Sequence, residues 1–372
     1  MLRTIAENGL TRTTRFAVAH EADEAGIRRL LRENSMRGAV SVTFEREPDY
    51  FRGTGLGGGV DQTIVAYEEN RLACMGRCTR RQCWVNGRAR TVGYLAELRL
   101  DARARRRFNI VRDGYQFFRQ QSGEELFFTS IASDNARARR LLESGLRGLP
   151  AYEFLGELVT LLIAVPRHAR AFRLRIESAT SADLPAVVRL LNEQGQRYQF
   201  ATVWTEQQLR DLAAHGLPAE RMQLAKVDGQ LVACGAFWDQ RGFRQTVIRG
   251  YAGPLRRVLP LVNLAHQVLR RPRLPVPGTV LAQAFLSPLA FKTGAEELLP
   301  AFVEAFFPRA AVASVEWLTL ALPVGDVRVT ELCQRFHVRT WPSRLYRVRW
   351  PELPASEEFS VSTPLLPDVS LL

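Results

Sequence analysis

The sequence contains almost no lysine, few cysteines and no long hydrophobic run. Its longest largely apolar run, residues 158–165, has eight residues, whereas a helix that crosses a bilayer needs about 18. The first 14 residues lack the apolar centre of a signal peptide. We therefore expect no membrane-spanning helix and no membrane partner, and the predicted compartment is the cytoplasm.

Lysine occurs only at Lys226 and Lys292, so arginine supplies nearly all of the positive charge behind the formal net charge of +13. The arginines are spread along the chain and do not form one basic tail. Charge alone is weak evidence for a nucleic-acid partner. Nucleic acid is therefore not the expected main partner, although an RNA- or DNA-binding protein that uses the arginine surface stays a third hypothesis.

Five cysteines are too few and too irregularly spaced for a zinc site. Cys74, Cys78 and Cys83 follow a C-x3-C-x4-C pattern with no histidine nearby, which differs from the usual zinc-ligand spacings. The odd count, without a secretory signal, favours reduced thiols. We expect buried, free cysteines and no metal.

The remaining composition, with 46% hydrophobic and 24% charged residues among 372, is typical of a globular protein of about two domains. An internal repeat supports two units. Residues 22–33 and 182–193 are identical at six of twelve positions, and both show the apolar spacing of a helix. Residues 64–76 and 223–235 both predict a hairpin with tight-turn residues between its strands.

The element order is also repeated. The first half predicts a strand at 16–18, a helix at 22–33, a helical stretch at 49–51, three antiparallel strands, a helix at 111–121, a strand at 126–131, a helix at 136–144 and a strand at 157–163. The second half predicts a central strand at 280–286, a helix at 295–307, a strand at 315–320, a helix at 329–336 and a last strand at 345–350. The domains expected are an arm (1–14), a first domain (15–166), a second domain (167–352) and a mobile Pro/Ser-rich tail (353–372).

One segment, residues 127–146, carries a specific resemblance. A strand is followed by Asn135, which suits a helix N-cap, and by the small Ala138, and Gly145 and Leu146 end the helix. This segment resembles the fifth strand and following helix of the GNAT fold of acyl-CoA-dependent N-acyltransferases. The resemblance implies an α/β (α+β) fold of two tandem GNAT-like domains, each a mixed, mostly antiparallel sheet flanked by helices.

The resemblance implies a donor site in the first half. In the family, pantetheine lies in a V-shaped splay between the fourth and fifth strands and pairs with strand backbone. This places Leu98 and Leu100, on the fourth strand, and Asn135 and Ala138 beside the pantetheine. The diphosphate would lie on a loop that opens the next helix, which here is Arg105, Arg106, Arg107, Phe108, Asn109 and Ile110.

That loop departs from the family pattern, because Phe108 and Ile110 replace two small residues that let backbone approach a diphosphate. The three arginines compensate through charge-assisted contacts in one interpretation. In the other, the loop is a solvated basic turn. The second half, at residues 289–294, lacks the pattern altogether. We expect the first half to bind the donor and the second to be a degenerate copy that completes the pocket or the sheet.

Two residues are candidates for catalysis. Glu97 stands where the family often has a base, and a carboxylate within an apolar strand is costly unless it is paired or functional. The alternative is a structural ion pair with a nearby arginine. Leu142 replaces the tyrosine that usually protonates the thiolate in the family, and Tyr152 is the candidate substitute, or else a half-buried aromatic residue.

The Gly-rich run 53–58 matches G-x-G-x-x-G but precedes a strand, so a dinucleotide site is excluded by context. A flexible loop beside the acceptor site is expected instead. The resulting hypothesis is an acyl-CoA-dependent N-acyltransferase, with acetyl-CoA or another acyl-CoA as co-substrate, a small-molecule or protein amine as acceptor, and no metal. The rival is a non-catalytic GNAT-like module that binds CoA, a metabolite or a protein; a homodimer is left open.

Overall fold

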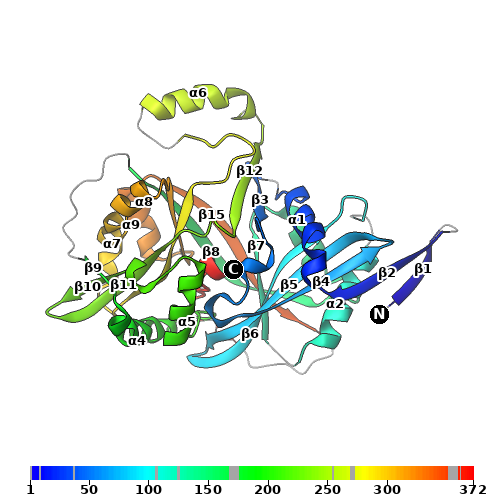
Figure 1. The fold of residues 1–372 in the computed structure, drawn as a ribbon, viewed down its shortest axis with the longest axis horizontal. Coiled ribbons are helices and arrows are strands. Elements are labelled where there is room, and N and C mark those ends of the chain that lie inside the picture. The colour runs from blue at the N-terminus through cyan, green and yellow to red at the C-terminus, as the bar shows by residue number, and fades with distance from the viewer. Residues whose placement is uncertain are drawn as a thin grey trace.

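The computed structural model describes residues 2–7, 10–36, 38–104, 108–123, 126–166, 176–253, 255–268, 273–350, 359–360 and 362–372. In these residues thirteen strands form one continuous sheet, and β3 and β12 form a separate two-stranded sheet. The halves lie side by side along the long axis of the molecule (Figure 1). The first half contributes β1 (Leu2–Glu7), β2 (Leu10–Val18), β3 (Val40–Glu45), β4 (Val60–Glu68), β5 (Arg71–Val85), β6 (Arg88–Leu100), β7 (Leu126–Ala132) and β8 (Ala151–Ala164).

The second half repeats much of this order. Its strands are β9 (Ile176–Ser178), β10 (Met222–Val227), β11 (Gln230–Trp238), β12 (Gln245–Tyr251), β13 (Gln283–Phe291), β14 (Trp317–Pro323) and β15 (Val338–Arg349). The helices of the chain are α1 (Glu24–Glu33), α2 (Phe108–Gln121), α3 (Ala136–Leu142), α4 (Leu184–Gly195), α5 (Glu206–Asp211), α6 (Leu255–Val268), α7 (Leu299–Ala305), α8 (Phe307–Val312) and α9 (Val327–Arg335).

The repeated segments form the expected elements. In α1 the apolar positions Ile27, Leu30 and Leu31 are all buried, as helical spacing requires. Successive side chains of β4 point to opposite faces of the sheet. Ile64 packs in a cluster with side chains of α2, and Val65 packs in a cluster with side chains of α1. The two helices therefore cover opposite faces. The predicted mixed α/β architecture is therefore confirmed.

The two halves exchange their last strands. The strand order runs β6-β7-β15-β8-β14-β13, so β15 of the second half lies between β7 and β8 of the first. Likewise β8 lies between β15 and β14, and all three of these pairings are antiparallel. The two predicted sheets are thus one sheet, and each half depends on the other for its inner strand.

A single shift relates the two central strand pairs. Strand β6 runs parallel to β7 from the pair Val92–Leu126, and β13 runs parallel to β14 from the pair Gln283–Trp317. Both members differ by 191 residues (283 minus 92, and 317 minus 126). The same shift aligns Tyr94-Leu95-Ala96-Glu97-Leu98 with Phe285-Leu286-Ser287-Pro288-Leu289.

The prediction of a mobile tail is wrong for the end of the chain. Ser370 is fully buried, and Leu371 is 2% exposed and belongs to the apolar cluster around α4. The apolar residues of this last segment pack in the interior, and its Leu365 forms a parallel β-bridge with Gln199. The backbone of the N-terminal arm forms β1 and part of β2, and the two strands pair with each other.

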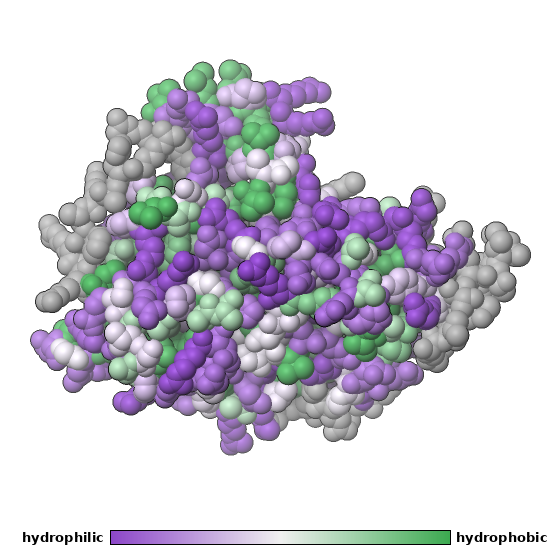
Figure 2. Space-filling model, viewed as in Figure 1, coloured by the Kyte–Doolittle hydropathy of each residue, from purple (hydrophilic) through white to green (hydrophobic). Residues whose placement is uncertain are grey.

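Helix α6 projects from the rest of the molecule (Figure 1). None of its described residues is buried, and Leu261, Leu264 and Val268 are 67%, 60% and 76% exposed. Figure 2 shows apolar residues gathered on this projection. Among the described residues, no helix is long and apolar enough to cross a membrane.

Candidate functional site

The first half opens between β6 and β7. Their parallel pairing ends at Tyr94 and Phe128, and the Thr129 hydroxyl donates to the Leu95 carbonyl at 2.7 Å just beyond. From there the strands separate, and a cavity of about 1490 Å³ occupies the space next to them. We call this opening the first splay. It lies where the sequence predicted a donor site.

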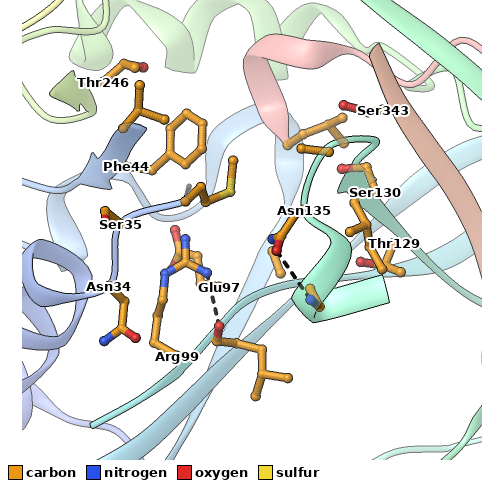
Figure 3. A pocket seen from close by; sticks show the side chains of 18 of the residues that line it. Asn34, Ser35, Phe44, Glu97, Arg99, Thr129, Ser130, Asn135, Thr246 and Ser343 are labelled. Carbon is orange, nitrogen blue, oxygen red and sulfur yellow. Dashed lines mark hydrogen bonds between the residues drawn. The ribbon is translucent and has the colours of Figure 1, made fainter. Parts of the chain in front are cut away.

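The cavity continues from the first splay across the second half. Directly paired residues of adjacent strands face the same side, so one face of the sheet forms its floor. The small sheet covers it, with Val42, Phe44 and Ile248 on the cavity side. Figure 3 shows Phe44 and Thr246 on one side of the cavity and Ser130, Asn135 and Ser343 on the other. Floor residues are Ser130 and Ala132 (β7), Trp341 and Ser343 (β15), Thr160 and Leu162 (β8), Trp317 and Thr319 (β14), and Gln283 and Phe285 (β13).

The equivalent opening in the second half, between β13 and β14, is filled. We call it the second splay. The Ser287 hydroxyl lies 2.6 Å and 2.7 Å from the two Asp368 carboxylate oxygens and 2.7 Å from the Ser370 hydroxyl. The short helix Val369–Leu371 contacts both β13 and β14. Only about 90 Å³ of space is left there, so the end of the chain occupies this splay.

A β-bulge interrupts β6 at the first splay. The pairing register shifts between Met75–Arg99 and Arg77–Ala96, and Glu97 has a left-handed φ of 54°. Bulges re-aim side chains and are frequent beside functional sites. Here the bulge brings Glu97 into the wall of the cavity, where it faces Arg99 (Figure 3).

Glu97 is an ion-paired carboxylate. Its Oε1 lies 2.6 Å from Arg46 Nη2, its Oε2 lies 3.6 Å from Arg77 Nε, and the Tyr50 hydroxyl donates to Oε2 at 3.1 Å. Burial raises the pKa of Glu97, but the two guanidinium groups outweigh burial and hold that pKa well below its usual range. A general base at neutral pH needs a raised carboxylate pKa, so this environment argues against the predicted role of Glu97 as base.

The charge around Glu97 is unbalanced. Arg46, Arg77, Arg99 and Arg244 all line the cavity. Burial lowers the pKa of Arg99 and, more strongly, that of Arg244, while Glu97 opposes both shifts. Arg99 donates to the Leu98 carbonyl at 3.0 Å, and its Nε has no partner. Two carboxylates, those of Glu97 and of Asp61, which lies 3.5 Å from Arg77, stand against the four guanidinium groups. This part of the wall therefore keeps an excess of positive charge, which favours anionic or neutral groups there.

A pair of tyrosines stands on another part of the same wall. Tyr115 on α2 and Tyr152 on β8 share a hydrogen bond between their hydroxyls, and both pack with Leu98, Ala138 and Leu142. Burial raises the pKa of Tyr115 to about 12 and that of Tyr152 well above its ordinary value. Both hydroxyls therefore stay protonated at neutral pH. Sequence reasoning found Tyr152 and missed Tyr115, whose place on α2 gave no motif.

Helix α3 is positioned as its sequence predicts. The Asn135 side chain caps it by accepting from the Ala138 amide at 3.3 Å, and both residues line the cavity (Figure 3). At the equivalent position in the second half, Asp326 caps α9 by accepting from the Arg328 amide at 3.0 Å. The residue that corresponds to Ala138 under the shift of 191 is the larger Val329.

The other predicted donor residues divide into three groups. Leu98, Leu100 and Phe108 line the cavity. Asn109 is half-buried at the start of α2, and Ile110 is 2% exposed within an apolar cluster, so the Ile110 side chain belongs to the core. The three arginines of the loop, Arg105, Arg106 and Arg107, lie outside the described residues.

The Gly-rich run 53–58 was expected to lie beside the acceptor site, but it is not part of the cavity lining. An added Cβ at Gly57, whose φ is 60°, would lie 2.8 Å from Leu371, and one at Gly58 would lie 2.2 Å from the Gln208 amide. These glycines therefore let the loop pack closely on α5 and on the chain end. Cys74, Cys78, Cys83 and Cys234 are buried and form no disulfide, as predicted, whereas Cys333 is exposed. No three His, Cys, Asp or Glu side chains of the described residues are grouped to hold a metal ion.

Comparison with known proteins supports the fold. No family model matches the sequence, and no curated protein matches it significantly. Among solved structures, Saccharomyces cerevisiae N-myristoyltransferase with bound myristoyl-CoA is similar with a TM-score of 0.60 and 10% identity over 96% of this chain and 89% of that chain. A GCN5-related N-acetyltransferase from Sphaerobacter thermophilus gives 0.55 and 12% over 92% and 98%.

A probable N-acyltransferase from Enterococcus faecalis V583 gives a TM-score of 0.50 with 12% identity over 91% of this chain and 73% of that chain. The chain thus has the GNAT fold of these acyltransferase structures, and the predicted resemblance is confirmed. Identities this low establish the fold alone, because one fold supports many functions.

Proposed function

We propose that this protein is an acyl-CoA-dependent N-acyltransferase whose donor site is the first splay. The observation that carries the proposal is the open first splay, which leads into a cavity of about 1490 Å³. Two parallel strands separate there beside a capped helix, which gives an extended ligand a free strand edge. The acyl group would be acetyl or longer, and the acceptor a small-molecule or protein amine in the cytoplasm.

The donor would lie between β6 and α3. Its pantetheine arm would pass the small Ala138 and the cap residue Asn135, and pair with β6 backbone near Leu98 and Leu100. The diphosphate would meet the basic loop 105–107 and the start of α2, where helix-end amides favour anions. Phe108 at this position narrows the approach, so we expect the arginine charges to contribute more than backbone contacts.

Transfer needs the amine nitrogen to attack the thioester carbonyl carbon and the carbon–sulfur bond to break. The electropositive wall around Glu97 disfavours an ammonium ion and stabilises the oxyanion that forms. A neutral amine is therefore the form that reacts. The Tyr115–Tyr152 pair keeps its protons at neutral pH, and its place beside Leu98 suits it to protonate the leaving thiolate. The proton that the amine nitrogen loses as the amide forms would pass through water to the tyrosine pair and replace the proton given to the thiolate.

The environment of Glu97 favours a second candidate function, which is CoA binding without acyl transfer. Arg46 and Arg77 hold the pKa of its carboxylate below the usual range, which makes Glu97 a weak base. A protein that binds CoA without transferring the acyl group would have the same splay and the same ion pairs. Such a module would bind acyl-CoA and release no thiol in the presence of any amine.

Calorimetry with acetyl-CoA and CoA tests the donor site. The variant Ala138→Phe fills the splay, and we expect it to weaken binding at least about tenfold. Arg140→Phe adds the same ring on the exposed side of α3, away from the cavity, and should bind like the wild type. Binding that survives Ala138→Phe unchanged would refute the placement, and no binding to either ligand at millimolar concentration would refute the proposal.

A further inference from the structure

The far end of the cavity holds an arginine and a tryptophan that each have one buried N–H donor without a hydrogen-bond partner. Trp317 is 2% exposed, and its Nε1 donor has no hydrogen-bond partner. The Arg339 Nε also has no partner, and its guanidinium carbon lies 5.6 Å from the centre of the Trp317 ring. Both side chains line the cavity. Buried donors without partners are costly, so this pair is suited to a ligand that accepts hydrogen bonds.

Among the described residues, no carboxylate forms an ion pair with Arg339, although Arg344 and Arg349 on the same strand pair with Glu157 and Glu153. Burial lowers the pKa of Arg339 and the nearby Tyr251 opposes that shift, yet the Tyr251 hydroxyl is already committed to the Pro275 carbonyl at 2.6 Å. The local charge is therefore an uncompensated, partly buried cation.

The floor between the first splay and this pair carries a row of polar side chains among apolar ones. Each of five adjacent strands contributes one hydroxyl or amide side chain to it, namely Ser130, Ser343, Thr160, Thr319 and Gln283. The opposite face of the same strands carries the apolar core, with Leu161 and Ile163 fully buried. A polar row on the cavity face favours a ligand with hydrogen-bonding groups along its length.

The strand register gives the distance between the first splay and the Arg339–Trp317 pair. Ser343 pairs with Ala132 at the first splay, and Arg339 lies four residues earlier on the same strand, opposite Leu162. At about 3.4 Å per residue, four residues span about 14 Å. The Arg339 guanidinium lies over the Trp317 ring, and Trp317 pairs with Ala164, which is two residues farther from the splay than Leu162. The bound anion would therefore lie at least about 14 Å from the splay.

We propose that Arg339 and Trp317 form a carboxylate-binding subsite for the acceptor, which is an amine that carries a carboxylate about 14 Å from its reacting nitrogen. The planar guanidinium suits a carboxylate, and the indole N–H supplies another donor. This inference rests on the proposed acyl transfer only where it calls the ligand an acceptor. The subsite itself would bind a carboxylate in the absence of CoA. Both residues belong to the second half, which thereby selects the acceptor.

Alanine peptides and their C-terminal amides test the subsite by calorimetry without CoA. We expect tri-, tetra- and penta-alanine to bind at least about tenfold more tightly than the matching amides, because only the acids offer a carboxylate. The preference should be largest for peptides of about four or five residues, which match the spacing. Arg339→Gln should abolish the preference, Arg339→Lys should keep part of it, and Trp317→Phe should reduce it about threefold.

Arg349→Gln is the matched control. Arg349 lies on the same strand, pairs with Glu153 at 2.9 Å and is off the cavity, so this variant should keep the full preference. Equal binding of acids and amides, a preference that survives Arg339→Gln, or no binding of any peptide up to about 10 mM would overturn the proposal. Loss of acyl-CoA binding with an intact peptide preference would refute the acyl transfer and leave the subsite standing.

Discussion

The first and second splays differ in content although their backbones correspond. Beyond Tyr94 the first splay has a bulge, a charged Glu97 and a large cavity. Beyond Phe285 the second has Ser287 and Pro288 where the first has Ala96 and Glu97, and the end of the chain fills the space. The same strand geometry therefore yields a ligand site or a packed core, depending on which side chains stand at two positions.

The difference extends to the helices that follow. Ala138 leaves room beside α3, whereas Val329 packs against the apolar core next to α9. The comparison suggests that a splay must either take a ligand or be filled by protein, because an unfilled apolar void forfeits packing contacts. In this molecule each alternative is used once.

The largest effect on stability is expected at Glu97, the buried charged residue of the first splay. Glu97→Gln removes the carboxylate that neutralises Arg46 and Arg77, and breaking a buried ion pair costs about 3–5 kcal/mol of unfolding free energy. Urea unfolding measures the change. Glu153→Gln breaks a more exposed pair with Arg349 and should cost under about 1 kcal/mol; similar losses in both variants would contradict the buried-pair interpretation.

The pH dependence of stability follows from the same residue. The folded-state pKa of Glu97 is depressed, so its stabilisation is complete above its unfolded pKa of about 4.3 and is lost as the pH falls below that value. In Glu97→Gln, stability should therefore fall less steeply on acidification below about pH 4.3 than in the wild type.

The next largest effect on stability is expected in the second splay, which the end of the chain fills. Leu371 is 2% exposed and contacts Gly57 of the first half, so Leu371→Ala should cost about 3 kcal/mol of unfolding free energy. Val312→Ala, at a side chain that is 90% exposed, should change it by less than about 0.5 kcal/mol. A loss below about 1 kcal/mol at Leu371 would show that the chain end fills the second splay without stabilising it.

A catalytic test sharpens the open side. If the tyrosine pair protonates the thiolate, Tyr152→Phe should lower kcat about 100-fold, or about 2.7 kcal/mol, and leave acyl-CoA binding within about threefold. Thiol release with an acceptor amine gives the rate. An unchanged kcat would assign Tyr152 to packing, and Tyr115→Phe should reproduce the loss only if the shared hydrogen bond matters.

The smallest effect is expected where the chain end is fastened. Ser287→Ala removes the hydroxyl that contacts Asp368 and Ser370, while Ser370 still donates to Asp368 at 2.8 Å. We expect a loss of about 1 kcal/mol and faster amide exchange at residues 369–371. Unchanged exchange would show that apolar packing alone holds the segment.

The sequence predicted the fold well because its signals were local. Helical spacing at Ile27, Leu30 and Leu31, turn residues such as Asn86, and the capped helix at Asn135 each depend on neighbours within a few residues. Asn135 and Ala138 were found in this way and do line the cavity. Their contact with CoA stays a prediction.

Long-range features escaped the sequence. Arg46, Arg244 and Tyr115 reach the cavity from three separate parts of the chain, and no spacing rule links residues about 200 positions apart. The partners of Glu97 were equally hidden, since Arg46 stands 51 residues away in the chain. The chain end was judged by its Pro/Ser content, whereas its burial depends on a splay formed by other strands.

The exchange of β15 and β8 also sets an order for protein synthesis. Strand β7 ends at Ala132, and its partner β15 ends at Arg349, so the ribosome must add more than 200 residues before that pair can form. At about 5–20 residues per second this takes on the order of 10–40 seconds. During that time β7 and β8 of the nascent chain expose the edges that β15 will cover, which makes this interval the one in which a chaperone would have most to protect.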